Sequence, residues 1–151
     1  MRLVLASASP RRLDLLARIR VVPDTVIAAD TVVAVGRRIL PKVEDEATLR
    51  ACMKLLSGRR HRVLTGVALA IPGGAIRERL VETMIAMKRL SDEEIDYYAS
   101  HGEWRGKAGG YALQGYGEVY VRHIAGSYSN VVGLPLAETR VLLKSAGYDI
   151  A

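Results

Sequence analysis

The sequence has little of what would cross-link a small fold or hold it in a membrane. It contains one cysteine, Cys52, and therefore no partner for an internal disulfide or a thiolate metal site. Because Cys52 lies on an apolar helical stripe, we expect it to pack in the core rather than to catalyse. All apolar runs are shorter than the roughly 18 residues that a membrane-spanning helix needs. These shortages argue against a disulfide scaffold and a helical membrane protein.

What remains is the composition of an ordinary globular protein. Hydrophobic residues make up 50% and charged residues 25% of the 151 residues, which argues against disorder. This length suits one domain, so we expect a single domain over residues 1–151. The N-terminal sequence lacks the cleavage pattern of a signal peptide, and we expect a cytoplasmic protein.

The chain is basic, with 22 lysines and arginines against 16 acidic residues and a formal net charge of +6. That sign fits an acidic partner such as a nucleotide or a nucleic acid. The positive residues are scattered in short clusters, however, and do not form a basic arm interleaved with aromatic residues. We therefore expect a small acidic ligand rather than a nucleic acid, and no membrane partner.

Hydrophobic periodicity predicts strands that alternate with helices. Two of the strands alternate apolar and polar residues and are joined by turn residues, which predicts an antiparallel hairpin. The fold class that follows is α/β, with a mixed, twisted sheet flanked by helices. We predict strands over 3–6, 25–35, 63–71, 76–88 and 117–124, and helices over 10–20, 45–57, 92–100 and 134–146.

Residues 7–12, Ser-Ala-Ser-Pro-Arg-Arg, directly follow the first apolar run, where a strand is expected to turn into a helix. Ser9 is a preferred N-cap, and the proline after it suits the first helical turn. The free N–H groups of that helix, together with the side chains of Ser7, Arg11 and Arg12, favour a phosphate ligand. The alternative is a capped helix with two solvated arginines.

Asp30 interrupts the apolar, β-branched run over 25–35, which we predict to be a buried strand. A carboxylate inside such a strand is costly unless it is paired, hydrogen-bonded or bound to a metal. If this strand and residues 7–12 meet at one edge of the sheet, Asp30 faces a bound phosphate chain. There it could orient a water molecule or hold Mg²⁺. The alternative is a core acid that caps a neighbouring loop.

Two lysines and a glycine-rich stretch are further candidates for ligand contacts. Lys42 follows a turn, and Lys107 opens a stretch in which Gly106, Gly109 and Gly110 permit unusual dihedral angles and close backbone approach. Gln114 offers an amide suited to a base edge or a phosphate. The alternative is that these are surface lysines and turn glycines.

Six motifs occur in the order typical of one family, and on them the chain resembles the Maf family over residues 3–147. The resemblance implies a nucleoside triphosphate pyrophosphatase, which cleaves between the α- and β-phosphates, and a fold similar to that of inosine triphosphatases. The motifs are SASPRR at 7–12, ADTVV at 29–33, LSG at 56–58, HRVLTG at 61–66, KAGGYALQG at 107–115 and NVVGLP at 130–135.

Within the family, the chain resembles the branch that acts on dTTP, UTP and modified pyrimidine relatives. The resemblance implies that Asp30 is the proton acceptor that activates water and that a divalent cation, Mg²⁺ or Mn²⁺, takes part. It does not assign the metal ligands. Positions linked to substrate choice are Arg11, Thr31 and Gln114, and phosphate-contacting positions are Arg12, Lys42 and Lys107.

The chain departs from the family pattern at two places. Pro41 and Val43 flank Lys42 where the family has glycine and proline, and this difference falls in the loop that carries Lys42. The link between Pro23 and Asp24 is also shorter than in family members, which carry several dozen more residues there, including a glutamate and a lysine of the active site. We favour a segment missing from this sequence over a true deletion, because every flanking motif is intact.

Two other functions stay open at this stage. One is a non-catalytic, nucleotide- or nucleic-acid-binding regulator of cell division, although a pure anion binder gains nothing from a carboxylate that faces its ligand. The other is the same chemistry on purine triphosphates such as ITP. The resemblance also makes a homodimer plausible.

Overall fold

The computed structural model describes residues 4–5, 11–12, 15, 18, 26–71 and 76–150. The chain forms two compact units. Unit 1 comprises residues 1–31, 65–81 and 129–151, and unit 2 comprises residues 32–64 and 82–128. Whether the two units make up the single domain predicted over 1–151 is not tested by this division, and that domain stays a prediction.

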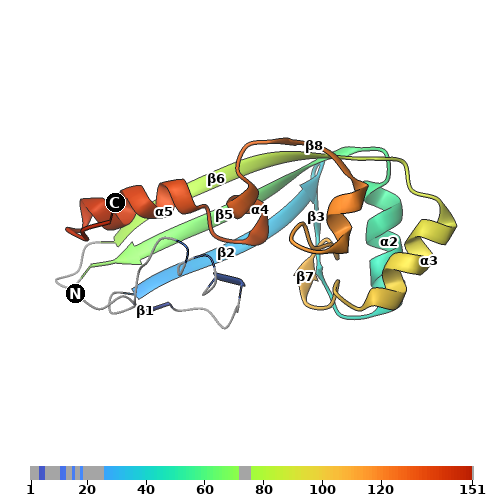
Figure 1. The fold of residues 1–151 in the computed structure, drawn as a ribbon, viewed down its shortest axis with the longest axis horizontal. Helices are drawn as coiled ribbons and strands as arrows, with labels where there is room; N and C mark the ends of the chain where they lie inside the picture. The colour runs from blue at the N-terminus through green and yellow to red at the C-terminus, as the bar shows by residue number, and fades with distance from the viewer. Residues whose placement is uncertain are drawn as a thin grey trace. The chain divides into compact units, whose positions relative to one another are not determined.

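The sheet is mixed, as the sequence predicts (Figure 1). Its strands follow the order β1-β2-β5-β6-β8, and β3 pairs with β2. β1 is parallel to β2, whereas the pairs β2 with β3 and β6 with β8 are antiparallel. With the helices, this confirms the α/β class. The strands are β1 (Val4–Leu5), β2 (Val26–Val35), β3 (Arg38–Leu40), β5 (Arg60–Ala70), β6 (Ile76–Met87) and β8 (Val121–Ala125).

Unit 1 has its own apolar core between the sheet and helix α5 (Leu136–Ser145). Pro135 stands at the N-cap, so the last helix begins close to its predicted position. The fully or nearly fully buried side chains of this core include Leu15, Ile27, Val67, Leu69, Leu142 and Leu143. Because β2 and β5 contribute to this core, their positions in unit 1 are fixed by apolar burial.

Helix α2 (Glu46–Leu56) in unit 2 confirms the helix predicted over 45–57. The Asp45 side chain caps it by accepting the N–H of Thr48 at 2.8 Å. Its buried residues recur with helical spacing and are Leu49, Cys52, Met53 and Leu56. Cys52 is 3% exposed, so its predicted place in the core is confirmed, and burial raises the pKa of its thiol.

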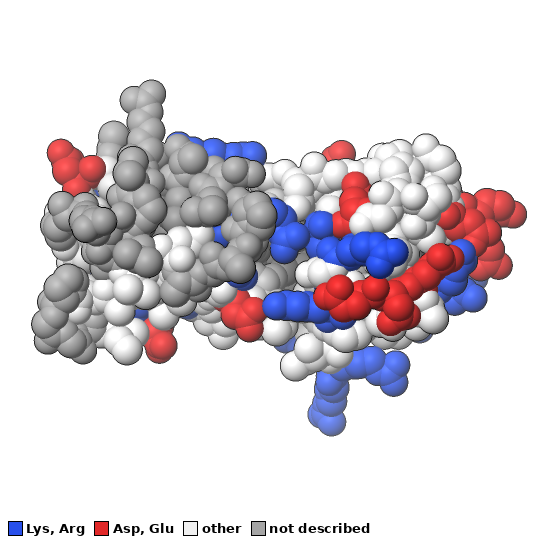
Figure 2. Space-filling model, turned by 90° about the horizontal axis from the view of Figure 1, so that it is seen from below, with Lys and Arg blue, Asp and Glu red and all other residues white. Residues whose placement is uncertain are grey.

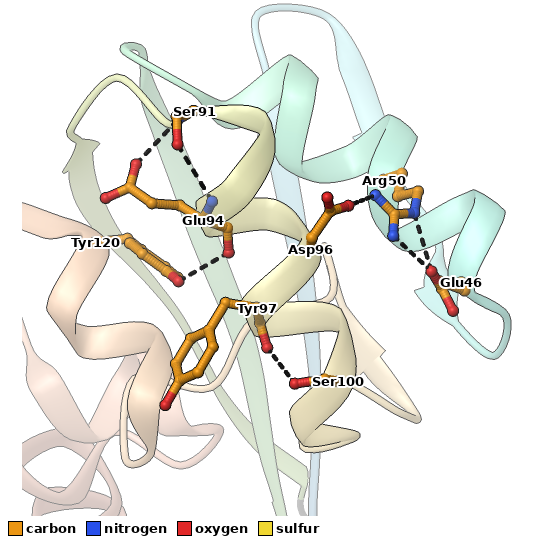
Figure 3. Close-up of polar contacts among 8 residues, drawn as sticks. All are labelled: Glu46, Arg50, Ser91, Glu94, Asp96, Tyr97, Ser100 and Tyr120. Carbon is orange, nitrogen blue, oxygen red and sulfur yellow. Dashed lines mark hydrogen bonds and ion pairs between the residues drawn. The ribbon is translucent and has the colours of Figure 1, made fainter.

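Helix α3 (Asp92–His101) begins at the predicted capping box, in which Ser91 accepts the N–H of Glu94 and Glu94 accepts the N–H of Ser91 (Figure 3). It ends at Gly102, whose φ of 71° closes the helix in the left-handed conformation. Figure 3 also shows Arg50 of α2 between Glu46 and Asp96, where it ties α2 to α3.

The strand predicted over 117–124 is wrong in its first half. Residues Tyr116–Tyr120 form a short 3₁₀ helix, η1, and β8 begins only at Val121. The cause is Glu103, whose carboxylate oxygens accept the N–H groups of Tyr116 at 3.0 Å and Gly117 at 2.9 Å. These donors are thereby removed from any sheet ladder.

Four short elements were not predicted from the sequence: β3, β4 (Lys42–Val43), β7 (Lys107–Ala108) and helix α4 (Tyr128–Val132). Of the helix predicted over 10–20, the described residues Arg11, Arg12, Leu15 and Arg18 are helical, and the rest lies outside the described residues. The hairpin strands β5 and β6 are neighbours in the sheet. No helix among the described residues is long and apolar enough to cross a membrane.

Candidate functional site

Oxygen atoms from distant parts of the sequence anchor Arg12 within unit 1. Its Nε donates to the carbonyl oxygen of Gly133 at 2.9 Å, and its Nη2 donates to the hydroxyl oxygen of Thr31 at 3.4 Å. Gly133 has a φ of 128°, a value that residues other than glycine rarely adopt. The backbone turn after α4 therefore presents its carbonyl to the guanidinium group.

A chain of hydroxyl groups continues from Thr31 into the core of unit 1. The hydroxyl oxygens of Thr31 and Thr65 lie 2.9 Å apart, and Thr65 donates to the carbonyl oxygen of Asn130 at 3.1 Å. Thr65 and Asn130 are completely buried. Since buried polar groups are hydrogen-bonded in native proteins, this series of hydrogen bonds fixes the Thr31 side chain from the buried side.

Two half-buried cations stand next to each other at this position. Burial lowers the pKa of Arg11 and of Arg12. The charge of Asp30 acts in the opposite direction on Arg12 and raises its pKa, whereas the charge of Arg11 lowers it further. Both groups remain charged, since arginine is not deprotonated in proteins. An anion would offset both their burial and their mutual repulsion.

The prediction that Asp30 is buried inside an apolar strand is wrong. Asp30 is exposed, and its Oδ1 accepts the N–H of Thr31 at 3.0 Å. It lines an open groove of about 610 Å³ in unit 1, together with Gly66, Glu78 and Arg79 among others. Successive strand residues face opposite sides, so Asp30 and Thr31 present their side chains to different faces of β2. The charge of Asp30 nevertheless raises the pKa of Arg12.

The two lysines and the glutamine belong to unit 2. β4 and β7 pair antiparallel, with Lys42 opposite Ala108 and Val43 opposite Lys107. Both lysines therefore lie on one small two-stranded sheet, Lys42 exposed and Lys107 half-buried with its Nζ donating to the carbonyl oxygen of Glu103. Gln114 is exposed a few residues beyond Lys107.

The glycines near Lys107 adopt the conformations that the sequence suggests. Gly106, Gly109 and Gly110 have φ values of 70°, 69° and 77°, in the left-handed region. A Cβ on Gly110 would lie 2.9 Å from side-chain atoms of both Leu49 and Val43. Glycine is therefore needed at position 110 for both its conformation and the space it leaves.

Two predicted ligand residues, Ser7 and Ser9, lie outside the described residues. Thr65, Asn130 and the carbonyl of Gly133 were not predicted to support the site. Sequence signals for these residues were nevertheless present. Thr65 is a polar residue on the buried face of a predicted strand, and Asn130 and Gly133 belong to the motif at 130–135. Glu103, which holds η1, carried no signal in the sequence.

The donor set at Asp30 is compatible with a hard divalent cation. Mg²⁺ commonly takes one or two carboxylates from the protein and fills its remaining positions with phosphate oxygens and water. Within the described ranges, no group of three or more His, Cys, Asp or Glu side chains is gathered in one place. The exposed Asp30 carboxylate supplies an oxygen donor of the kind that a cation shared with a phosphate ligand uses.

Comparison with known proteins identifies relatives along nearly the whole chain. The sequence profile described as "Maf-like protein" matches residues 19–146. The dTTP/UTP pyrophosphatase of Novosphingobium aromaticivorans is 49% identical over 187 residues, covering 98% of this chain and 93% of the relative. That of Caulobacter vibrioides is 50% identical over 185 residues, covering 97% and 96%. That of Rhodopseudomonas palustris is 61% identical over 127 residues, covering 83% and 60%.

The first two alignments are longer than the 151 residues of this chain. The relatives therefore carry residues without a counterpart here, which is in keeping with a segment missing between Pro23 and Asp24. That junction lies outside the described residues, and the missing segment stays a prediction.

Proposed function

This chain belongs to the Maf family, and we propose that it hydrolyses pyrimidine nucleoside triphosphates such as dTTP and UTP to the monophosphate and pyrophosphate. The support from comparison is that relatives about 50% identical over nearly the whole chain are named dTTP/UTP pyrophosphatases. The proposed enzyme is thus a hydrolase of acid anhydrides.

One structural observation carries the proposal, which is the pair of half-buried arginines in unit 1. Arg12 is oriented by Gly133 and Thr31, and Arg11 adds a second positive charge beside it. Two like charges beside each other in a partly desolvated place favour the binding of an anion. A triphosphate supplies several negative oxygens, and guanidinium groups bind such oxygens in a bidentate manner.

We assign the proton transfer to Asp30. In the proposed reaction a water oxygen attacks the α-phosphorus, the bond from the α-phosphorus to the α,β-bridging oxygen breaks, and pyrophosphate leaves. The Asp30 carboxylate accepts the proton that the water loses. Arg12 binds the phosphate oxygens as negative charge shifts toward the leaving group. A bound Mg²⁺ or Mn²⁺ would supply charge neutralisation on the phosphates, with Asp30 as its protein ligand.

The remaining candidate residues receive roles on two grounds. From the strand-to-helix turn over 7–12, we propose that Ser7 and Ser9 contact the phosphates. From the family resemblance, we propose that Lys42 and Lys107 also contact the phosphates and that Arg11, Thr31 and Gln114 influence the choice of substrate. The substrates are intracellular metabolites, so the proposed compartment is the cytoplasm. A homodimer is part of the proposal only through resemblance.

The face of the molecule drawn in Figure 2 does not favour a long polyanion as the partner. In the face shown in Figure 2, basic and acidic side chains stand beside one another rather than forming one continuous basic band. A nucleic-acid binder typically presents such a band. Binding of RNA or DNA that falls steeply with salt concentration would contradict this proposal.

A panel of nucleoside triphosphates tests the substrate class. We expect pyrophosphate and the monophosphate from dTTP and UTP, with turnover per mole of enzyme well above that for ITP, GTP and ATP. Faster turnover of ITP would move the enzyme to purine substrates. Release of inorganic phosphate with a nucleoside diphosphate would mean cleavage between the β- and γ-phosphates and would contradict the proposed reaction.

A further inference from the structure

We propose that Thr65 is a positioning residue, which fixes the hydroxyl group of Thr31 as a hydrogen-bond acceptor and thereby holds Arg12 ready for an anion. The chain of contacts lies wholly within unit 1 and joins Arg12, Thr31, Thr65 and Asn130. The identity of the anion rests on the proposed function, but the order of the hydrogen bonds does not.

The direction of each hydrogen bond follows from the chemistry of the two ends. The carbonyl oxygen of Asn130 can only accept, so the single hydroxyl proton of Thr65 goes to it at 3.1 Å. Thr65 then has no proton left for its 2.9 Å contact with Thr31, so Thr31 is the donor there. The reverse order would set two acceptors against each other in a fully buried position, which is costly.

Because its proton goes to Thr65, the hydroxyl oxygen of Thr31 can only accept hydrogen bonds from other groups of the site. Arg12 can only donate, and its Nη2 contact of 3.4 Å with the Thr31 oxygen fits this assignment. Thr31 therefore supports the guanidinium group and does not donate to a phosphate oxygen. A ligand group that contacts Thr31 directly would have to bring its own N–H or O–H.

The Asn130 carbonyl keeps a partner even without Thr65, because it also accepts the N–H of Gly133 at 3.1 Å. The isosteric variant Thr65→Val thus removes the acceptor for the Thr31 proton, while the Asn130 carbonyl still accepts a hydrogen bond. The freed Thr31 hydroxyl can rotate and turn its proton toward Arg12, which weakens the support of the guanidinium group. The effect should reach the ligand through Arg12 alone.

The test measures binding of inorganic pyrophosphate by calorimetry on the whole chain, with thermal unfolding measured in parallel. We expect Thr65→Val to weaken binding by roughly 3- to 10-fold, the loss of about one hydrogen bond, and Thr65→Ser to restore it to within about 2-fold. In the Arg12→Ala background, Thr65→Val should change binding by less than about 2-fold, because a residue that acts through Arg12 has nothing left to act on.

The matched control is Thr83→Val. Thr83 is equally buried, and its hydroxyl both donates to the carbonyl oxygen of Ser127 and accepts the N–H of Ser127. This variant should lose stability without losing pyrophosphate affinity. Should Thr65→Val fail to fold, Thr31→Val removes the other hydroxyl of the pair from a half-buried position and should weaken binding equally.

Three results would overturn the role of Thr65: unchanged pyrophosphate affinity in Thr65→Val, a Ser variant as weak as the Val variant, or an undiminished effect in the Arg12→Ala background. None of them depends on turnover. If the wild-type chain binds pyrophosphate but hydrolyses no triphosphate, the proposed function fails while the positioning role is still measured.

Discussion

The Nε2 atom of His61 lies 2.7 Å from the hydroxyl oxygen of Tyr111, and both residues are buried in unit 2. Burial lowers the pKa of His61 to about 4 and raises that of Tyr111. The imidazole is therefore neutral at physiological pH. Tyr111 belongs to the same stretch as Lys107 and Gln114, so this hydrogen bond anchors the segment that carries both.

This pair predicts a stability that decreases in acid. Between pH 6.5 and 4 the unfolded chain binds a proton on His61 that the folded chain does not, so stability is complete above pH 6.5 and falls as the pH approaches 4. The shift corresponds to about 3 kcal/mol. Urea unfolding at pH 7 and pH 4.5 should show this loss in the wild type and in the exposed control His123→Gln, but much less of it in His61→Gln. An equal loss in all three would refute the assignment.

Replacing Arg12 should weaken the enzyme in both ground and transition states. We expect Arg12→Ala to raise KM for UTP by about 10-fold or more and to lower kcat as well, because a phosphate contact at an activated bond is lost. Arg12→Lys should recover only part of this, since a lysine cannot contact Gly133 and Thr31 at once in the guanidinium geometry. The exposed Arg18 provides the control, and Arg18→Ala should behave as the wild type.

Gly110 should not tolerate a side chain. Its φ of 77° costs an alanine about 1 kcal/mol, and the Cβ would lie 2.9 Å from Leu49 and Val43. We expect Gly110→Ala to lower the free energy of unfolding by about 2–4 kcal/mol. Gly36 also has a positive φ, but a Cβ there meets nothing within 4 Å. Gly36→Ala should therefore show the conformational cost alone, and similar losses in both variants would contradict the steric argument.

Glu103 should determine whether η1 forms. Glu103→Gln keeps one acceptor oxygen but sets an amide NH₂ against a backbone N–H of Tyr116 or Gly117. We expect a loss of about 1–3 kcal/mol in the free energy of unfolding. Amide hydrogen exchange at residues 116 and 117 should become faster, whereas exchange within α2 should not change. Unaltered exchange at 116 and 117 would show that other contacts hold the turn.

The elements predicted correctly are those in which a periodic pattern meets a local end signal. Leu49, Cys52, Met53 and Leu56 recur with helical spacing after the Asp45 cap, and the structure places them in the core of unit 2. The capping box of Ser91 and Glu94 likewise begins a helix. Such elements depend on residues close in the sequence, so their signals can be read without the fold.

The failures concern contacts between distant residues. Glu103 reaches 13 and 14 residues ahead to bend a segment whose own composition favours a strand, and no local pattern shows this. β4 and β7 are two residues long, too short for any periodicity. Asp30 was expected to be buried because its neighbours are apolar, yet apolar residues on one face of a strand do not decide whether the other face is covered.

The sequence indicated which residues belong to the site, but not which of them contact each other. Arg12 and Thr31 are 19 positions apart and contact each other, whereas the supporting hydroxyl of Thr65 comes from a different strand. Which strand residues face each other depends on the register of the sheet, and register is not readable from two isolated strands.

The most direct measurement is pyrophosphate release from UTP and dTTP by the whole chain with Mg²⁺, compared between wild type, Asp30→Asn and the control Asp96→Asn, which removes a carboxylate that pairs with Arg50. The account predicts stoichiometric pyrophosphate and monophosphate from the wild type and the control, and a kcat at least about 100-fold lower for Asp30→Asn. Turnover by Asp30→Asn equal to that of the wild type, or no pyrophosphate above background from the wild type, would contradict it.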